Sequence, residues 1–142
     1  MIYDTVLMLF ASFGFSMIIG TKRRHYITCA ILGSVSFCIS SQLLEITDSI
    51  LITSVISSAI SSIASQTIAR TAKAPATIFL LPSILPLVPG RRFFYAISSA
   101  LAQNSENALA YFIQTLEYTA GISTGIMLGS SLCKIVLAAK AK

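Results

Sequence analysis

Charged residues are scarce in this sequence of 142 residues. Ten are basic and five are acidic, so that 11% of the chain is charged while 55% is hydrophobic. Soluble domains contain about 25% charged residues, because a folded surface in water needs them. The composition therefore excludes a water-soluble domain, a disordered chain and a coiled coil.

Residues that perform chemistry are equally scarce. His25 is the single histidine and lies among basic residues, whereas a general acid or base needs a positioned partner. The sequence contains no nucleophile elbow, no Walker loop and no His-Glu-x-x-His motif. Cys29, Cys38 and Cys133 form no Cys-x-x-Cys pair, so we expect small buried hydrophobic side chains. We predict no enzymatic activity, no metal and no cofactor.

What the sequence does contain is a series of long stretches without charge. They cover residues 5–21, 25–44, 49–69, 74–90 and 118–133. A bilayer core about 30 Å thick requires about 20 apolar residues of helix, so the chain has the length for about five crossings. We predict an all-α, polytopic membrane protein in which residues 1–142 form a single integral membrane domain. The expected helices are 4–20, 26–44, 49–70, 74–103 with a break near 82–90, and 107–138.

The net charge of +5 is clustered at the ends of these stretches. The basic residues of these clusters are Lys22, Arg23, Arg24, Arg70, Lys73, Lys134, Lys140 and Lys142. The positive-inside rule places such clusters in the cytoplasm. We therefore expect a cytoplasmic (inner) membrane protein whose N-terminus is outside and whose C-terminus is cytoplasmic. Basic residues at alternate helix boundaries orient helices and indicate no nucleic-acid partner.

The fourth stretch holds three prolines within residues 82–89. Proline lacks an N–H and clashes with the carbonyl four residues earlier, which leaves the carbonyls of Ile78, Pro82 and Leu85 without helical partners. Unpaired backbone at membrane depth is tolerated only against protein or a water-filled cavity. We expect this stretch to face the bundle or a cavity, followed by a second half-helix or an outer interfacial helix. The alternative is a re-entrant hairpin that returns to the inside.

The break has the composition of a substrate site. Secondary transporters bind substrates where a helix is interrupted, and here the freed carbonyls precede Arg91 and Arg92 at a new helix start. A substrate ammonium group could face those carbonyls, while Arg91 and the helix N-terminus bind its carboxylate. The predicted substrate-binding residues are Pro82, Ser83, Pro86, Pro89, Gly90, Arg91, Arg92 and Tyr95. In the other interpretation the helix is only kinked and the arginines lie at the outer headgroups.

Two further features concern the last helix. Glu117 is an acid inside a predicted crossing and is a proton-coupling candidate, although it could also lie near the outer interface and reach it. Gly121, Gly125 and Gly129 follow a Gly-x-x-x-Gly register typical of helix packing. Serines recur every three or four residues between 54 and 65, which predicts close helix packing or a polar lining for a transport path.

Residues 74–132 resemble the threonine/serine exporter (ThrE-like) membrane family. The resemblance covers PATIFLLPSILPLVPGRRFFYAISS and the following ALAQNSENALAYFIQTLEYTAGISTGIMLGSSL. Its most specific part is the pattern Pro-x-x-Pro-Gly-x-x-x-x-Tyr, formed by Pro86, Pro89, Gly90 and Tyr95. The earlier helices resemble the family in length and character.

The resemblance implies the small-subunit form of a split exporter, a five-helix half that works with a larger partner subunit or as a homo-oligomer. Its glycine and serine faces offer packing surface for such a partner. Substrates in this family include threonine and serine, and split systems are linked to dicarboxylate export. Family members often carry a small residue after the Pro-Gly pair, so Arg91 and Arg92 depart from that pattern and suit a more anionic substrate. The alternative is a non-transporting scaffolding subunit of a membrane complex.

Overall fold

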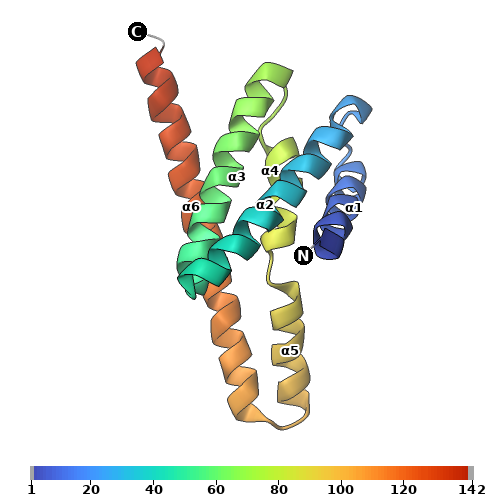
Figure 1. Cartoon of the computed structure of the whole chain (residues 1–142), viewed down its shortest axis with the longest axis vertical. Coiled ribbons are helices and arrows are strands. Elements are labelled where there is room, and N and C mark those ends of the chain that lie inside the picture. Colours follow the sequence, from blue (N-terminus) through green and yellow to red (C-terminus); the bar gives the residue numbers. More distant parts are fainter. Residues whose placement is uncertain (1, 141–142) are drawn as a thin grey trace.

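The computed structural model describes residues 2–140, and within that range it is built of helices. Figure 1 shows a bundle from which a two-helix hairpin projects. The elements are α1 (Ile2–Ile18), the 3₁₀ turn η1 (Arg23–His25), α2 (Tyr26–Thr47), α3 (Ile50–Ala72), α4 (Thr77–Ile84), the 3₁₀ turn η2 (Leu85–Leu87), α5 (Gly90–Leu101) and α6 (Ser105–Lys140). The all-helical fold class is thus confirmed. Lys142, one of the predicted orienting lysines, lies outside the described residues.

Within the described residues, three helical stretches are long and apolar enough to cross a membrane. They are Arg23–Thr47, Ile50–Ala72 and Ser105–Val136. Two further apolar helical stretches, Tyr3–Ile18 and Thr77–Leu87, are shorter. At about 1.5 Å per residue, the second of these spans little more than half of a bilayer core. The chain is therefore a multi-pass membrane protein, and the number of crossings stays a prediction.

Left-handed residues end the long helices of the bundle. Asp48 has φ 50° and donates its N–H to the Leu44 carbonyl at 3.2 Å. Lys73 has φ 49°, and the next N–H, of Ala74, bonds to the Ala69 carbonyl at 2.9 Å. Such caps satisfy carbonyls that have no partner within the helix. With these caps, α2 ends at Thr47 and α3 at Ala72, which is three and two residues beyond the ends that we predicted.

The predicted fourth segment consists of α4, η2 and α5. The helix runs through Pro82 and ends at Ile84, and after η2 the backbone is extended at Val88, with φ −64° and ψ 126°. α5 then continues away from the α3–α4 end of the bundle, and only α6 returns toward that end (Figure 1). The segment before the extended residue packs against α1, α2 and α3, so the proline-rich stretch faces the bundle, as expected.

The glycine register of α6 packs against the serine face of α3. A β-carbon placed on Gly121 would lie 1.8 Å from Ser54 Oγ, and one on Gly125 would lie 2.0 Å from Ser58 Oγ. Side chains cannot approach so closely, so only glycine allows this contact. Gly121, Gly125 and Gly129, which we predicted to pack against a helix, thus lie where α6 approaches α3 most closely. These faces are used within the chain, however, and our expectation that they offer packing surface to a partner is wrong.

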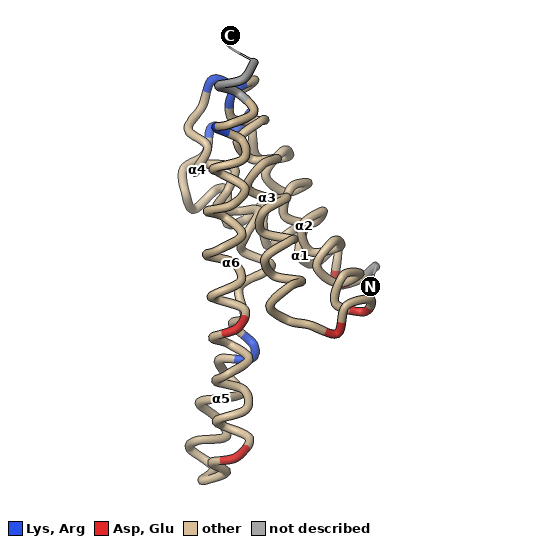
Figure 2. Tube along the Cα trace, turned by 90° about the vertical axis from the view of Figure 1, so that its left-hand side faces the viewer, with Lys and Arg blue, Asp and Glu red and all other residues tan. Residues whose placement is uncertain are grey.

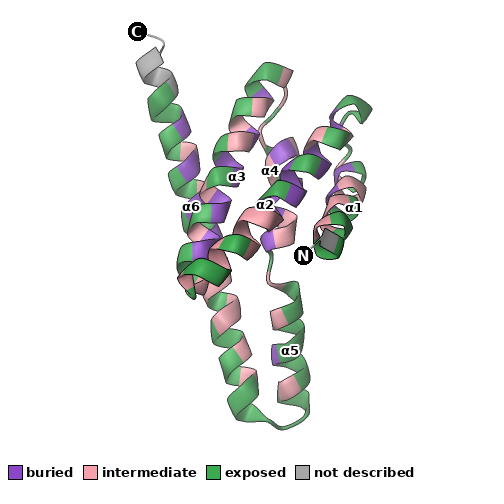
Figure 3. Cartoon of the chain, viewed as in Figure 1, coloured by how far each residue is buried: buried purple, intermediate pink, exposed green. Residues whose placement is uncertain are grey.

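The other side of α3 carries a second row of buried serines. Ser61 Oγ lies 2.7 Å from Ser36 Oγ of α2, and Ser65 Oγ lies 3.3 Å from Ser83 Oγ of α4. Ser61 also donates to the carbonyl four residues earlier, at 2.7 Å, which satisfies a hydroxyl without water. Figure 3 shows the buried residues concentrated where α2, α3 and α4 meet. The core of this bundle is therefore unusually rich in hydroxyl groups.

Candidate functional site

A pocket of about 430 Å³ opens where the bundle meets the projecting hairpin. Residues of α1, α2, the η2–α5 connection, α5 and α6 line it. They are Met8, Phe37, Ser40, Ser41, Leu44, Pro86, Leu87, Val88, Pro89, Arg91, Arg92, Tyr95, Tyr111 and Tyr118. This volume suits a small metabolite, and the lining combines apolar walls with a few polar groups, as ligand sites do.

The proline-rich connection places both arginines at the pocket. Val88 is extended, Pro89 precedes the first residue of α5, and the Pro89 carbonyl accepts the Phe93 N–H at 3.0 Å. Arg91 and Arg92 therefore lie in the first turn of α5, where free N–H groups and the helix dipole favour an anion. In Figure 2 the basic residues gather at one end of the bundle, apart from a patch at the start of α5.

Neutral groups orient the two guanidinium groups. Arg92 Nη1 donates to Gln114 Oε1, and its guanidinium lies over the Tyr118 ring, 5.2 Å from the ring centroid. Arg91 lies over the ring of Tyr95 at 5.9 Å. In the part of the chain that the structure describes, no ion pair joins either arginine to an acid. Within those residues the partners of both guanidinium groups are neutral, so the two positive charges can serve an anionic ligand.

The family comparison covers all of these residues. The family model described as threonine/serine exporter, ThrE, matches residues 4–132, from the beginning of α1 to near the end of α6. The chain belongs to the threonine/serine exporter (ThrE) family. This match confirms the predicted resemblance and extends it to the first three helices. No curated protein and no solved structure shows significant similarity to the chain.

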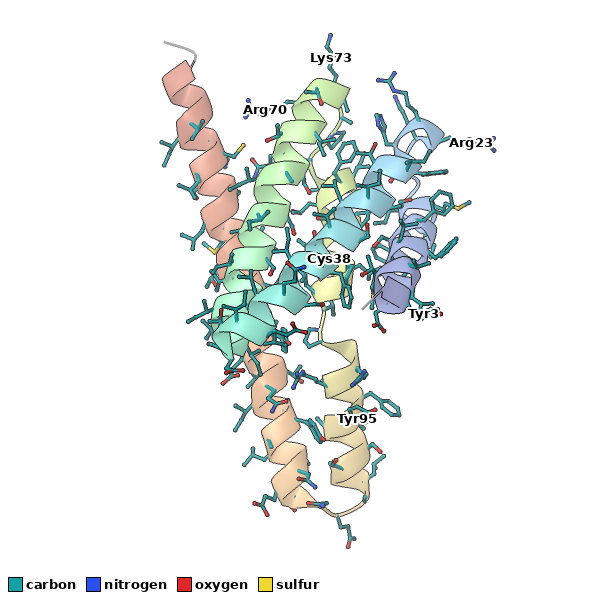
Figure 4. The ribbon with its side chains drawn as sticks, viewed as in Figure 1. Tyr3, Arg23, Cys38, Arg70, Lys73 and Tyr95 are labelled. Atoms are coloured by element: carbon teal, nitrogen blue, oxygen red, sulfur yellow. The ribbon has the colours of Figure 1, made fainter. Side chains whose placement is uncertain are left out.

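Five of the eight site residues predicted from the sequence line the pocket of this ThrE family member: Pro86, Pro89, Arg91, Arg92 and Tyr95. Figure 4 shows Tyr95 on α5, in the projecting hairpin. Gly90 is exposed at the start of that helix but does not line the pocket.

The other two, Pro82 and Ser83, are completely buried in the bundle and do not reach the pocket. Ser83 Oγ donates to the Leu80 carbonyl at 2.8 Å. The structure therefore separates Pro82 and Ser83, both predicted to bind substrate, from the pocket, because α4 remains helical through Pro82 and turns them inward.

The three carbonyls expected to be free have different surroundings. The Leu85 carbonyl accepts the Val88 N–H at 3.2 Å, so our expectation is wrong for this residue. The Ile78 carbonyl accepts a hydrogen bond from the Cys29 thiol at 3.6 Å. Pro82 faces Pro86, which has no N–H to offer, while the Leu85 N–H donates to Leu81. The prolines remove regular helical hydrogen bonds in this stretch. Hydrogen bonds from the Cys29 thiol and the Val88 N–H replace part of them.

Sequence reasoning missed the contribution of α6 to the pocket. Tyr111 and Tyr118 line it, Gln114 orients Arg92, and the rings of Tyr95 and Tyr111 lie 5.7 Å apart. The signal was present as spacing, because residues 111, 114 and 118 recur every three or four positions and share one face of a helix. Only the antiparallel pairing of α5 with α6 shows that this face meets the arginines.

Glu117 lies on α6 next to this site. It is half-buried and falls between Gln114 and Tyr118, the two residues that contact Arg92. It does not line the pocket itself. The structure therefore places the only acid in this part of α6 within one turn of the arginine contacts, which is where a coupling residue could influence them.

Proposed function

We propose that this chain is a subunit of a secondary transporter that exports small amino acids, threonine and serine, or related carboxylates across the cytoplasmic membrane. Membership of the ThrE family supports an exporter. The observation that carries the substrate class is the pocket beside Arg91 and Arg92, whose guanidinium groups contact neutral side chains in the described part of the chain. An anionic group bound there would gain charge-assisted, bidentate hydrogen bonds.

The proposed topology has five crossings, with α4, η2 and α5 together forming the fourth. Apart from the patch at the start of α5, the basic residues gather at the end of the bundle where Arg23, Arg70 and Lys73 are drawn (Figures 2 and 4). The positive-inside rule places that end in the cytoplasm and the N-terminus outside. In this orientation the pocket lies toward the outer face of the membrane. An exported substrate would therefore approach the pocket from the cytoplasmic, basic end of the bundle. A second cavity of about 450 Å³, lined by Gln66, Arg70 and Lys73 among others, opens at that end.

We propose that a larger subunit of the same family, or a second copy, completes the transporter. The support is the α5–α6 hairpin, because α5 makes its contacts with α6 and projects beyond the bundle (Figure 1). Phe94 is 65% exposed, Leu101 81% and Leu109 61%. A partner or lipid must cover such a surface, and the glycine and serine faces are not available because they pack inside the chain.

The alternative function is a scaffolding subunit that transports nothing. A scaffold explains the exposed hairpin equally well. It does not explain why two arginines line a pocket at the break of a helix, where their guanidinium groups contact neutral side chains among the described residues. The pocket therefore favours transport.

Export from cells provides the test. In cells that lack this chain, we expect intracellular threonine, serine or a related carboxylate to accumulate, and the medium to contain correspondingly less. Re-expression of the wild-type chain should restore export, whereas a chain lacking the α5–α6 hairpin should not. Unchanged metabolite levels in the deletion strain, with every candidate carboxylate measured, would contradict the exporter proposal and favour the scaffold.

We further propose that Glu117 couples export to protons. Replacing Glu117 with glutamine keeps the shape and removes the titratable group, so export should lose its dependence on the proton gradient while substrate binding persists. The measurement is substrate transport in membrane vesicles with and without an imposed pH gradient. Glu106, an exposed acid in the first turn of α6, supplies the control substitution. A Glu117→Gln transporter that still responds fully to the gradient rules out this role.

A further inference from the structure

The second cavity lies at the basic end of the bundle, where the last turn of α3 leads into α4. Its volume is about 450 Å³. The residues that line it are Gln66, Ala69, Arg70, Lys73, Ala74, Pro75 and Ala76. It shares no lining residue with the arginine pocket, so the proposed substrate site does not account for its two cations.

The end of α3 supplies the polar side of this cavity. Gln66 and Arg70 are four residues apart in α3 and therefore share a face of the helix. Lys73 ends the helix in a left-handed conformation, and the next N–H, of Ala74, bonds to the Ala69 carbonyl at 2.9 Å. This turn brings the small apolar residues 74–76 to the same cavity. The lining thus combines two cations and an amide with an apolar wall.

Both cations can serve a ligand. Arg70 and Lys73 are exposed, and Figure 4 shows their side chains at the end of α3. Among the residues that the structure describes, neither forms an ion pair with an acid, and Figure 2 shows no Asp or Glu at this end of the bundle. Gln66 donates one amide hydrogen to Ser62 Oγ at 3.3 Å, and an amide carries two. The cavity therefore offers donors and positive charge to an anion.

The position of the cavity along α3 indicates which anion it meets. The 23 residues of α3 are long and apolar enough to cross a membrane. At about 1.5 Å per residue they extend about 35 Å, slightly more than a hydrocarbon core of about 30 Å. The last turn of α3, with Arg70, therefore lies at the level of the lipid phosphates. This holds for either orientation of the chain in the membrane.

We propose that this cavity binds the headgroup of an anionic phospholipid. Arg70 and Lys73 donate charge-assisted hydrogen bonds to the phosphate oxygens, and the apolar wall contacts the lipid glycerol. A zwitterionic headgroup binds less tightly, because the same two cations repel its ammonium group. Basic pockets between membrane helices recognise anionic headgroups in this way. The inference does not depend on which substrate the chain exports.

The test measures lipid binding to the full chain, purified in a neutral detergent with any subunit that accompanies it. Native mass spectrometry during titration gives the apparent Kd for phosphatidylglycerol, with the zwitterionic phosphatidylethanolamine as the comparison lipid. For the double variant Arg70→Gln/Lys73→Gln we expect the Kd for phosphatidylglycerol to rise at least about tenfold. The variant should also lose the preference of the wild-type chain for phosphatidylglycerol. Each single variant should give an intermediate rise, and an unchanged Kd in both overturns the site.

A matched variant separates this cavity from the general attraction of a basic surface. Arg23→Gln/Arg24→Gln removes the same charge from exposed residues near the same end that do not line the cavity. It should change the Kd for phosphatidylglycerol less than about twofold, and a rise equal to that of the cavity variant overturns the proposal. Inorganic phosphate or threonine at millimolar concentration should not displace the lipid. Displacement by either one would assign the cavity to a free anion and overturn the lipid site.

Discussion

Export by the Arg92→Ala chain is expected to fall by at least about a hundredfold, the largest functional effect of any single substitution considered. Arg92 donates to Gln114 and lies over the Tyr118 ring, so its guanidinium is held in place before the substrate arrives. Removing it loses the charge-assisted bonds to the substrate, worth about 1.5–3 kcal/mol each, and also leaves Gln114 without its partner. The measurement is the rate of substrate release from cells expressing each variant at equal membrane levels.

Two further substitutions make the result specific. Arg92→Lys retains the charge but not the planar fork, so we expect an intermediate rate. Arg24→Ala removes an exposed cation at the basic end of the bundle and should not reduce the rate of release. If Arg24→Ala and Arg92→Ala impair export equally, the effect is one of total charge or topology, and the pocket is not the substrate site.

The largest effect on stability is expected at Gly125. A β-carbon there would lie 2.0 Å from Ser58 Oγ and 2.4 Å from the Val55 carbonyl oxygen. The carbonyl belongs to the backbone of α3 and cannot rotate away, so Gly125→Ala must push α3 and α6 apart. Overpacking costs about 1–3 kcal/mol, and here the displaced helices also lose their other contacts. We expect a lower melting temperature in detergent and faster degradation in cells.

A rescue experiment distinguishes this clash from a general loss of flexibility. At Gly121 the close atoms are the Oγ and β-carbon of Ser54, whereas the nearest backbone atom, the Leu51 carbonyl oxygen, is 3.1 Å away. Combining Gly121→Ala with Ser54→Gly removes the obstructing side chain and should recover part of the melting temperature. Ser58→Gly should not rescue Gly125→Ala, because the Val55 carbonyl remains. Equal rescue at both positions would contradict the described packing.

Several features of the fold followed from local chemistry. The scarcity of charge and the length of the uncharged stretches predict apolar helices from each segment alone, without knowledge of what that segment packs against. Helix ends were predicted to within a few residues in α2 and α3, because basic and acidic residues mark them. The glycine register identified one helix interface, since only small residues allow such close approach.

The candidate site depends on contacts between helices, and the local sequence of each helix does not specify such contacts. Pro82 suggests a broken helix, yet α4 runs through it, because α1, α2 and α3 pack around this stretch. That packing turned Ser83 inward and satisfied the Ile78 carbonyl with the Cys29 thiol. The serine repeat of α3 likewise allowed either packing or a polar lining, and contacts on two opposite sides, to α6 and to α2 with α4, decided how it is used.

The sequence by itself determined the class of protein and the approximate helices, and it singled out Arg91 and Arg92 as candidates, because composition and proline chemistry act on each segment separately. The tertiary structure decided which groups share the site with those arginines. The antiparallel pairing of α5 with α6 brings Gln114 and Tyr118 to Arg92, and the connection through η2 brings Pro86 and Pro89 to the same pocket. Such contacts join residues far apart in the chain, so only the folded arrangement specifies them.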